Sequence, residues 1–319
     1  MTLWFASGDI WHLAPCPLYP SDAMAVYIKL ILTALFWGGT FIAGRALAQN
    51  VGPYSAAFLR FLLASGLLFL IVRRFHGGLP RLEKDQAFAV FILGMTGVFA
   101  YNAFFFSGLR LVDAGRASLI IANNPIVITV FSAIIFRERL TPLKLLGILL
   151  SVTGALVVIS KGSLAVVTQG GIGRGEIYIM GCVASWATYS LVGKVVLKRL
   201  SPLVSVCYSA AIGTLCLLGP ALWEGMLGDL GEYVATDWLS IVYLGVFGTV
   251  FGFVWYYQGI QAIGAVRASL FINFVPIFAI LLAYLILDEP ITLSLLAGAA
   301  FISVGVYLTN DKLQMTSGE

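Results

Sequence analysis

The sequence predicts an all-α membrane protein of about ten transmembrane helices, arranged as two inverted five-helix repeats. The first observation that predicts this class is composition: of 319 residues, 60% are hydrophobic and 11% are charged. A soluble domain keeps its surface solvated with about a quarter charged residues. Lipid must therefore cover most of this molecule, and its 34 glycines suit helices that pack closely in a bilayer.

The second observation is a series of apolar runs, each close to the length of about 20 residues that a bilayer core requires. The expected spans are residues 26–48, 53–73, 86–109, 115–136, 142–160, 175–197, 202–223, 238–262, 266–287 and 291–309. Turn and charge signals separate them, for example Arg137-Glu138-Arg139 and Asp288-Glu289-Pro290.

The N-terminal segment differs from the rest because it is rich in Pro and aromatic residues and lacks the basic region of a signal peptide. Since Met24 runs directly into the first span, we interpret the segment before it as disordered or as a start-site artefact. The expected organisation is a leader (1–23), a first repeat (24–160), a connecting loop (161–174), a second repeat (175–310) and a C-terminal tail (311–319).

Basic residues in the loops predict the orientation. With both termini in the cytoplasm, 13 Lys and Arg residues fall in cytoplasmic segments and 4 outside, while Arg45 and Arg60 lie within or near spans. Cytoplasmic loops normally carry the excess of Lys and Arg. The sequence therefore predicts a multi-pass protein of the inner (plasma) membrane with both termini cytoplasmic.

The third observation is an internal repeat. Residues that recur at equal spacing in the first spans of the two halves are Trp37, Gly44-Arg45 and Pro53 against Trp186, Gly193-Lys194 and Pro202. Later matches are Gly108, Arg116-Ala117-Ser118-Leu119, Pro125, Glu138 and Thr141 against Gly259, Arg267-Ala268-Ser269-Leu270, Pro276, Glu289 and Thr292. Five spans per half is an odd number, so the second half enters the membrane from the opposite side. Inverted repeats favour a transporter; the alternative is a duplication that only built a stable scaffold.

At these residues the sequence resembles the drug/metabolite transporter superfamily, and specifically its EamA family. The resemblance rests on the repeated motifs above, on Trp37-Gly38 and on Arg60-Phe61, and it covers residues 24–310. It implies a ten-helix carrier similar to exporters of amino acids and related metabolites. The resemblance alone favours export over import, and it does not specify the solute.

Polar and aromatic residues at mid-span are the candidate substrate-binding residues, because a carrier needs a polar pocket near the midplane. They are Trp37, Thr40, Tyr101, Asn102, Asn123, Asn124, Trp186, Tyr189, Trp255, Tyr256, Gln258 and Asn273. For Asn123 and Asn273, which lie near prolines, substrate binding and hydrogen bonding between helices are equally supported. For the equivalent pair Trp37 and Trp186, lining of a cavity is favoured over packing.

Two further features bear on coupling and assembly. Arg60 lies about two turns into the second span, where it is expected to meet a carboxylate or a helix C-terminus, or to bind an anionic group. No Asp or Glu occupies a midplane position, which argues against a carboxylate relay for protons. Small residues such as Gly147, Ser151 and Gly154 predict tight packing within the bundle, with a homodimer contact as the alternative.

Other classes of protein find little support in the sequence. Its histidines are His12 and His76, and it has no metal-type spacing, Gly-rich phosphate loop or cluster of acids, so we expect no enzyme, catalytic residue, cofactor or metal site. The net charge of +4 is spread along the chain, which argues against nucleic acid as a partner. A channel would show a re-entrant filter, and a scaffold or receptor would carry larger soluble parts. The expected partners are a small-molecule substrate and the lipid bilayer.

Overall fold

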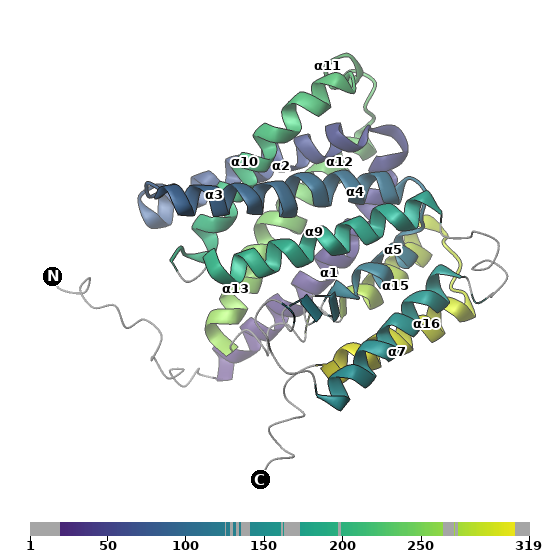
Figure 1. The fold of residues 1–319 in the computed structure, drawn as a ribbon. Helices are drawn as coiled ribbons and strands as arrows, with labels where there is room; N and C mark the ends of the chain where they lie inside the picture. Colours follow the sequence, from purple (N-terminus) through teal and green to yellow (C-terminus); the bar gives the residue numbers. More distant parts are fainter. Residues whose placement is uncertain are drawn as a thin grey trace, which may run out of the picture.

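The computed structural model describes residues 20–309 except 125, 128–129, 132–133, 135–140, 161, 163–172, 197–198, 264–270 and 272–273. In this part of the chain the regular structure is helical and no strand occurs. The helices form a bundle in which the long helices lie side by side (Figure 1). Most of the expected leader, connecting loop and tail, together with Asn273, lie outside the described residues.

The first half begins with two long helices. Its elements are α1 (Pro20–Asn50), α2 (Pro53–His76), α3 (Lys84–Leu93), the π-helix η1 (Gly94–Ala100), α4 (Tyr101–Leu109), α5 (Ala114–Ile121) and α7 (Pro142–Ile159). Proline opens α2 and α7 at a position whose N–H would lack a helical partner anyway. At the other end of α2, Gly77 adopts a left-handed conformation (φ 73°) that stops the helix.

The second half repeats this order. Its elements are α9 (Arg174–Val196), α10 (Pro202–Trp223), α11 (Met226–Asp229), α12 (Ala235–Tyr243), the π-helix η2 (Leu244–Phe251), α13 (Gly252–Ile263), α15 (Val275–Leu287) and α16 (Leu293–Thr309). Among the described residues, 6 helical runs are long and apolar enough to cross a bilayer, and Val275–Leu287 and Leu293–Leu308 are shorter apolar helices. The fold is thus a helical, multi-span bundle, while the number ten stays a prediction.

Two of the expected spans are not uniform α-helices. The spans expected over 86–109 and 238–262 contain η1 and η2, which the sequence analysis did not anticipate. Within η2, the Thr249 hydroxyl donates to the carbonyl of Leu244, five residues earlier, at 3.0 Å. Side-chain donation to a backbone carbonyl loosens the regular α-helical ladder. π-helical turns of this kind frequently mark functional sites.

The two π-helices occupy equivalent places in the repeat. Each has a glycine that packs against the first helix of the other half: Gly97 meets the ring of Tyr189, and Gly248 meets Thr40. A Cβ at Gly248 would lie 2.6 Å from Thr40 Cγ2, so only glycine leaves room for this approach. Thr40 and Tyr189 are themselves equivalent, three residues after Trp37 and Trp186. The repeat in the sequence is therefore matched by repeated packing between the halves.

Equivalent helices run in opposite directions. Near its end, α1 contacts the carbonyl of Leu109 through Arg45, whereas α9 begins beside the next turn, where Gly175 approaches Leu111. We call this side of the bundle the latch face; it holds the ends of α1, α4, α10 and α15 and the starts of α2, α5, α9, α12 and α16. The opposite side, the terminus face, holds the start of α1 and the end of α16 (Figure 1).

Apolar side chains lie both between the helices and on the outside surface of the bundle, as is typical of a membrane protein. Large side chains such as Phe105 and Phe106 are fully buried between helices. Outward-facing apolar residues remain uncovered, among them Leu70, Leu149 and Leu285, each at least 60% exposed. Exposed apolar surface on this scale marks contact with lipid or with other proteins, and contact with lipid agrees with the apolar helices of span length.

Candidate functional site: a central cluster and the latch face

Aromatic rings from both halves meet in the middle of the bundle. The members of this central cluster are Trp37, Tyr101, Trp186, Tyr189, Phe253 and Tyr256. The Trp37 ring centroid lies 5.7 Å from that of Phe253 and 5.4 Å from that of Tyr256. Trp186 lies 5.4 Å from Tyr101, 5.2 Å from Tyr189 and 6.5 Å from Phe253. Five of the predicted residues are therefore brought together.

Phe253 links the two equivalent tryptophans, and the sequence analysis did not select it. A usable signal existed, because the spacing of Gly108 and Gly259 makes Phe253 the repeat equivalent of Asn102. The predicted aromatic residues are all Trp or Tyr, which carry a polar group, whereas the phenyl ring of Phe253 carries none.

A buried polar group lies beside this cluster. The Arg60 side chain, with the residue 8% exposed, donates from Nη1 to Asn102 Oδ1 at 3.0 Å and from Nε and Nη2 to Thr249 Oγ1 at 3.4 Å each. The Trp37 indole donates to the carbonyl of Gly248, the residue before Thr249, at 2.9 Å. Among the described residues Arg60 meets neither a carboxylate nor a helix C-terminus, and binding of an anionic group stays a prediction. Arg60 joins the two π-helical regions instead.

The asparagines of the fourth span lie apart from the cluster. Asn123 Oδ1 accepts from the Ser151 hydroxyl at 2.7 Å, and its Nδ2 donates to the carbonyls of Leu119 and Ile120. These bonds tie the end of α5 to α7. Asn124 is 9% exposed, and its Oδ1 has no hydrogen-bond partner among the described residues. The helix expected over 115–136 is interrupted at this point, because residues 122 and 123 form a turn.

The remaining candidates take other positions. The Thr40 hydroxyl is buried and donates to the carbonyl of Trp37 at 2.6 Å. Trp255 packs against Phe36 at 5.6 Å. Gln258 is exposed and accepts from Lys29 Nζ at 2.9 Å, away from the aromatic cluster. Substrate binding by any of these residues stays a prediction.

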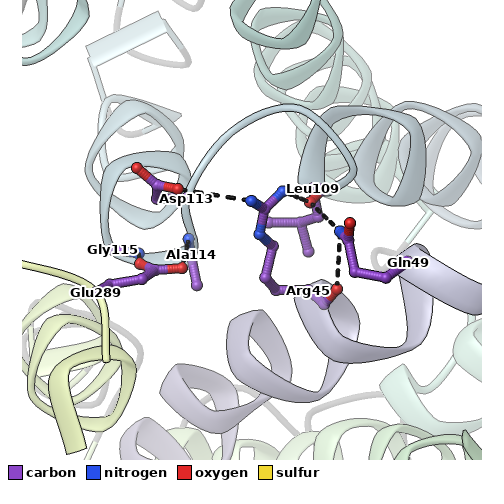
Figure 2. Close-up of polar contacts among 7 residues, drawn as sticks. All are labelled: Arg45, Gln49, Leu109, Asp113, Ala114, Gly115 and Glu289. Atoms are coloured by element: carbon purple, nitrogen blue, oxygen red, sulfur yellow. Dashed lines mark hydrogen bonds and ion pairs between the residues drawn. The ribbon is translucent and has the colours of Figure 1, made fainter. Parts of the chain in front are cut away.

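At the latch face, carboxylates of the second half cap helices of the first. Glu224 accepts from the backbone N–H of Tyr54 at 3.2 Å and from the N–H and hydroxyl of Ser55 at 2.8 Å each. Glu289 accepts from the N–H groups of Ala114 at 2.8 Å and Gly115 at 3.1 Å (Figure 2). The residues that precede these helices make no side-chain cap of their own. The first N–H groups of α2 and α5 therefore depend on the other half.

Further polar contacts join the halves on the same face. Arg116 pairs with Glu176 at 3.1 Å and also donates to the carbonyl of Ile159. Asn50 Nδ2 donates to Asp237 Oδ1 at 3.2 Å. The Arg116–Glu176 and Asn50–Asp237 contacts and the two glutamate caps link one repeat to the other, so this face is fastened by polar groups at several points.

Arg45 strengthens the same region from within the first half. Its guanidinium lies 3.6 Å from Asp113 and donates to the carbonyl of Leu109, which also accepts from Gln49 (Figure 2). Partial burial raises the pKa of the nearby Glu289 carboxyl, although the two amide hydrogen bonds that it accepts act in the opposite direction. The turn between α4 and α5 is thus held on both sides by charged groups.

Comparison with known proteins agrees with this architecture. The sequence matches the EamA-like transporter family over residues 24–160 and 173–311. It is 30% identical to the uncharacterized transporter YyaM of Bacillus subtilis, over 91% of this chain and 95% of that protein. It is 32% identical to an uncharacterized transporter of Archaeoglobus fulgidus, over 91% of this chain and all of that one.

A more distant relative has a more specific name. The probable terminal-alkyne amino-acid exporter of Streptantibioticus cattleyicolor is 28% identical over 89% of this chain and 92% of its own length. A crystal structure that shares 20% identity has the same fold, with a TM-score of 0.62, and covers 91% of this chain and 99% of its own. The matched regions, the helical architecture and the named relatives establish a multi-pass membrane protein, and the chain belongs to the EamA-like transporter family.

Proposed function

We propose that this protein carries a small organic metabolite, an amino acid or a related compound, across the inner membrane by alternating access of its two repeats. The central cluster supports the proposal, because both halves supply rings to it at mid-span and polar groups lie beside it. Pockets that hold small organic molecules are mostly apolar and aromatic with a few placed polar groups. The name of the Streptantibioticus relative favours an amino acid and export.

The observation that carries the proposal is that, among the residues the structure describes, the two faces are fastened unequally. On the latch face, Glu224 and Glu289 cap helices of the other half. On the terminus face, α10 is capped within its own half by the Ser201 hydroxyl. Separation of the halves at the latch face would leave helix N–H groups without acceptors, whereas the cap of α10 would survive separation at the terminus face.

The described polar contacts between the halves at the terminus face are exposed ones: Lys29 donates to Gln258, Tyr208 donates to the carbonyl of Pro80, and Arg199 pairs with Asp85. Arg199 lies 2.7 Å from Asp85, but both side chains are more than 60% exposed. Exposed pairs contribute about 0–1 kcal/mol. We infer a state that is closed at the latch face and more easily opened at the terminus face. With both termini cytoplasmic, as the loop charges predict, the closed side is the external one.

The experiment is transport by the full chain in liposomes. Radiolabelled leucine, phenylalanine and threonine serve as probes, and folded protein is verified by its thermal unfolding. We expect saturable uptake of at least one probe, accelerated when the same unlabelled compound is loaded inside, because alternating access exchanges solutes. Flux that never exceeds that of empty liposomes would contradict the proposal.

The same assay separates the proposal from its rivals. A channel would give flux that rises linearly with concentration and shows no acceleration by internal solute. A scaffold would give no flux. Chemical conversion of the probe, checked by chromatography of the recovered label, would indicate a membrane enzyme.

A further inference from the structure

Arg60 is a buried cation whose described partners are all neutral. It lies about 10 Å from the start of α2 at 1.5 Å per residue, well inside the bundle. Charged groups are almost never fully buried unless they are paired. Among the described residues no carboxylate lies within 4.0 Å of this guanidinium, and the sequence places no Asp or Glu at the middle of any expected span.

Comparison with the other partly or fully buried arginines shows how unusual this is. Arg45 pairs with Asp113, and Arg116 pairs with Glu176; each also donates to a backbone carbonyl. Among the described residues Arg60 donates to an amide oxygen and a hydroxyl, and its Cζ lies 5.2 Å from the centroid of the Phe61 ring, although a guanidinium offers five N–H donors. Two of its bonds share one oxygen at 3.4 Å, beyond the usual range of about 2.7–3.2 Å. The donor capacity of Arg60 is thus poorly used in this state.

The partners of Arg60 connect it both to the other half and to the central cluster. Thr249 belongs to η2 of the second half, so its hydroxyl would leave Arg60 when the repeats move apart. A Cβ at Gly248 would lie 3.7 Å from Arg60 Nη2, and the carbonyl of the same residue accepts from the Trp37 indole of the cluster. A solute held among the rings would therefore lie next to the guanidinium.

We infer that Arg60 binds a carboxylate of the transported solute, which takes the place of Thr249 when the two halves separate. A carboxylate matches the guanidinium fork with two parallel hydrogen bonds and supplies the missing negative charge. This inference rests on the proposed function and restricts its substrates to compounds with a carboxylate.

The test compares binding of acids with binding of their neutral-carbonyl counterparts. The probes are leucine and leucinamide, phenylalanine and phenylalaninamide, and threonine and threoninamide. Each pair differs in the group that Arg60 would contact. Binding is measured as a concentration-dependent rise in the unfolding temperature of the full chain in detergent. We expect at least one acid to bind the wild type at least about tenfold more tightly than its amide, since hydrogen bonds to charged groups contribute about 1.5–3 kcal/mol.

Variants at Arg60 identify the residue responsible. Arg60→Gln should weaken binding of that acid about tenfold or more and remove the preference over the amide. Arg60→Lys keeps the charge without the fork and should retain part of the preference. Arg73→Gln, the same change at an exposed arginine on the same helix, should leave the preference intact. Unchanged acid binding in Arg60→Gln, or equal binding of acid and amide by the wild type, would overturn the inference.

A second variant covers the case in which Arg60→Gln does not fold. Thr249→Val removes the hydroxyl that competes with the carboxylate and leaves Arg60 in place. It should bind the acid as tightly as the wild type or more tightly. Weaker binding would contradict the inference, because it would mean that the link between Arg60 and Thr249 acts only in packing.

The two proposals fail in different ways. Acid binding that depends on Arg60, without saturable flux in liposomes, would overturn transport and support the carboxylate site. Saturable flux of an acid that persists unchanged in Arg60→Gln would support transport and overturn the site. No binding of any acid of the panel by the wild type would also overturn the site.

Discussion

At the residue scale, the same side-chain type serves different purposes in this protein. Asn123 links two helices: its Oδ1 accepts from the Ser151 hydroxyl at 2.7 Å, and its Nδ2 donates to backbone carbonyls of α5. Asn102 accepts from Arg60 beside the aromatic cluster. Both lie at mid-span in the sequence, and both are buried. Their partners separate the structural amide from the amide near the candidate pocket.

Replacement of Asn123 should therefore lower stability and leave solute preference unchanged. Asn123→Ala leaves the Ser151 hydroxyl without its buried acceptor, and a lost buried hydrogen bond costs about 1–3 kcal/mol. Ser151→Ala removes the same bond. The double variant should therefore be about as stable as the less stable of the two single variants. Thermal unfolding of the three variants measures this. Additive losses in the double variant, or a changed order of preferred solutes, would refute the structural role.

Replacement of Trp186 should affect transport instead. Its ring contacts Tyr101, Tyr189 and Phe253 at the junction of the halves. Trp186→Ala should lower the apparent affinity for solute about tenfold if the ring contributes roughly 1.5 kcal/mol of contact to the bound compound. Counterflow in liposomes gives the apparent affinity. Trp238→Ala, at a partly exposed ring outside the cluster, is the control and should transport normally.

At the element scale, the π-helices join the halves through close glycine contacts. The room for a side chain at Gly248 is limited by one atom, Thr40 Cγ2, at 2.6 Å from the position of a Cβ. Gly248→Ala should therefore destabilise the protein by about 1–3 kcal/mol through overpacking. The double variant Gly248→Ala with Thr40→Ser removes that atom and should recover most of the loss. The unfolding temperature reports both changes, and a double variant no more stable than Gly248→Ala would show that this contact is not the cause.

At the scale of the whole molecule, the latch should control access to the centre. Cys182 is a natural reporter, since its buried thiol lies 3.4 Å from the carbonyl of Tyr101. In a chain whose other cysteines are replaced by Ala, Glu224→Gln with Glu289→Gln should accelerate labelling of Cys182 by an impermeant maleimide added outside cells. A helix cap contributes about 1 kcal/mol, which corresponds to about a fivefold larger open population.

The matched control uses the same substitution on the same face. Glu232→Gln changes an exposed glutamate of the segment before α12 and should leave the labelling rate unaltered. If the double variant Glu224→Gln with Glu289→Gln labels no faster than Glu232→Gln, the glutamates act only as local caps and do not hold the two halves together at the latch face.

The orientation is also a property of the whole chain. Since α1 begins and α16 ends on the terminus face, reporter fusions to the N- and C-terminal ends should fall on one side of the membrane, the cytoplasmic side according to the loop charges. A fusion in the segment between α10 and α12 should report the opposite side. Ends on opposite sides would contradict the antiparallel relation of the repeats and the transport mechanism with it.

Features of the sequence were sufficient to predict a helical, multi-span membrane protein built from two repeats. Apolar runs of span length are properties of short windows of chain, and lipid imposes helices on any such run. The repeat in register becomes visible when the two halves of the chain are compared. The equivalence of Trp37 and Trp186 also followed from spacing, and the two rings do lie in one cluster. The π-helices were not predicted, although glycines recur in both segments. The spacing of apolar residues along a span does not distinguish a π-helical turn from an α-helical turn.

The pairing of polar groups was decided only by the tertiary structure. Arg60 and Thr249 are separated by 189 residues, and Ser55 and Glu224 by 169. Nothing in the neighbourhood of either residue in the chain specifies such a partner. A buried polar group must find an acceptor somewhere, but the choice depends on how the antiparallel halves bring distant helices together. The sequence by itself thus determined a duplicated, helical membrane protein. The packing of the repeats decided which polar contacts fasten the latch face and which buried cation has, among the described residues, no carboxylate within 4.0 Å.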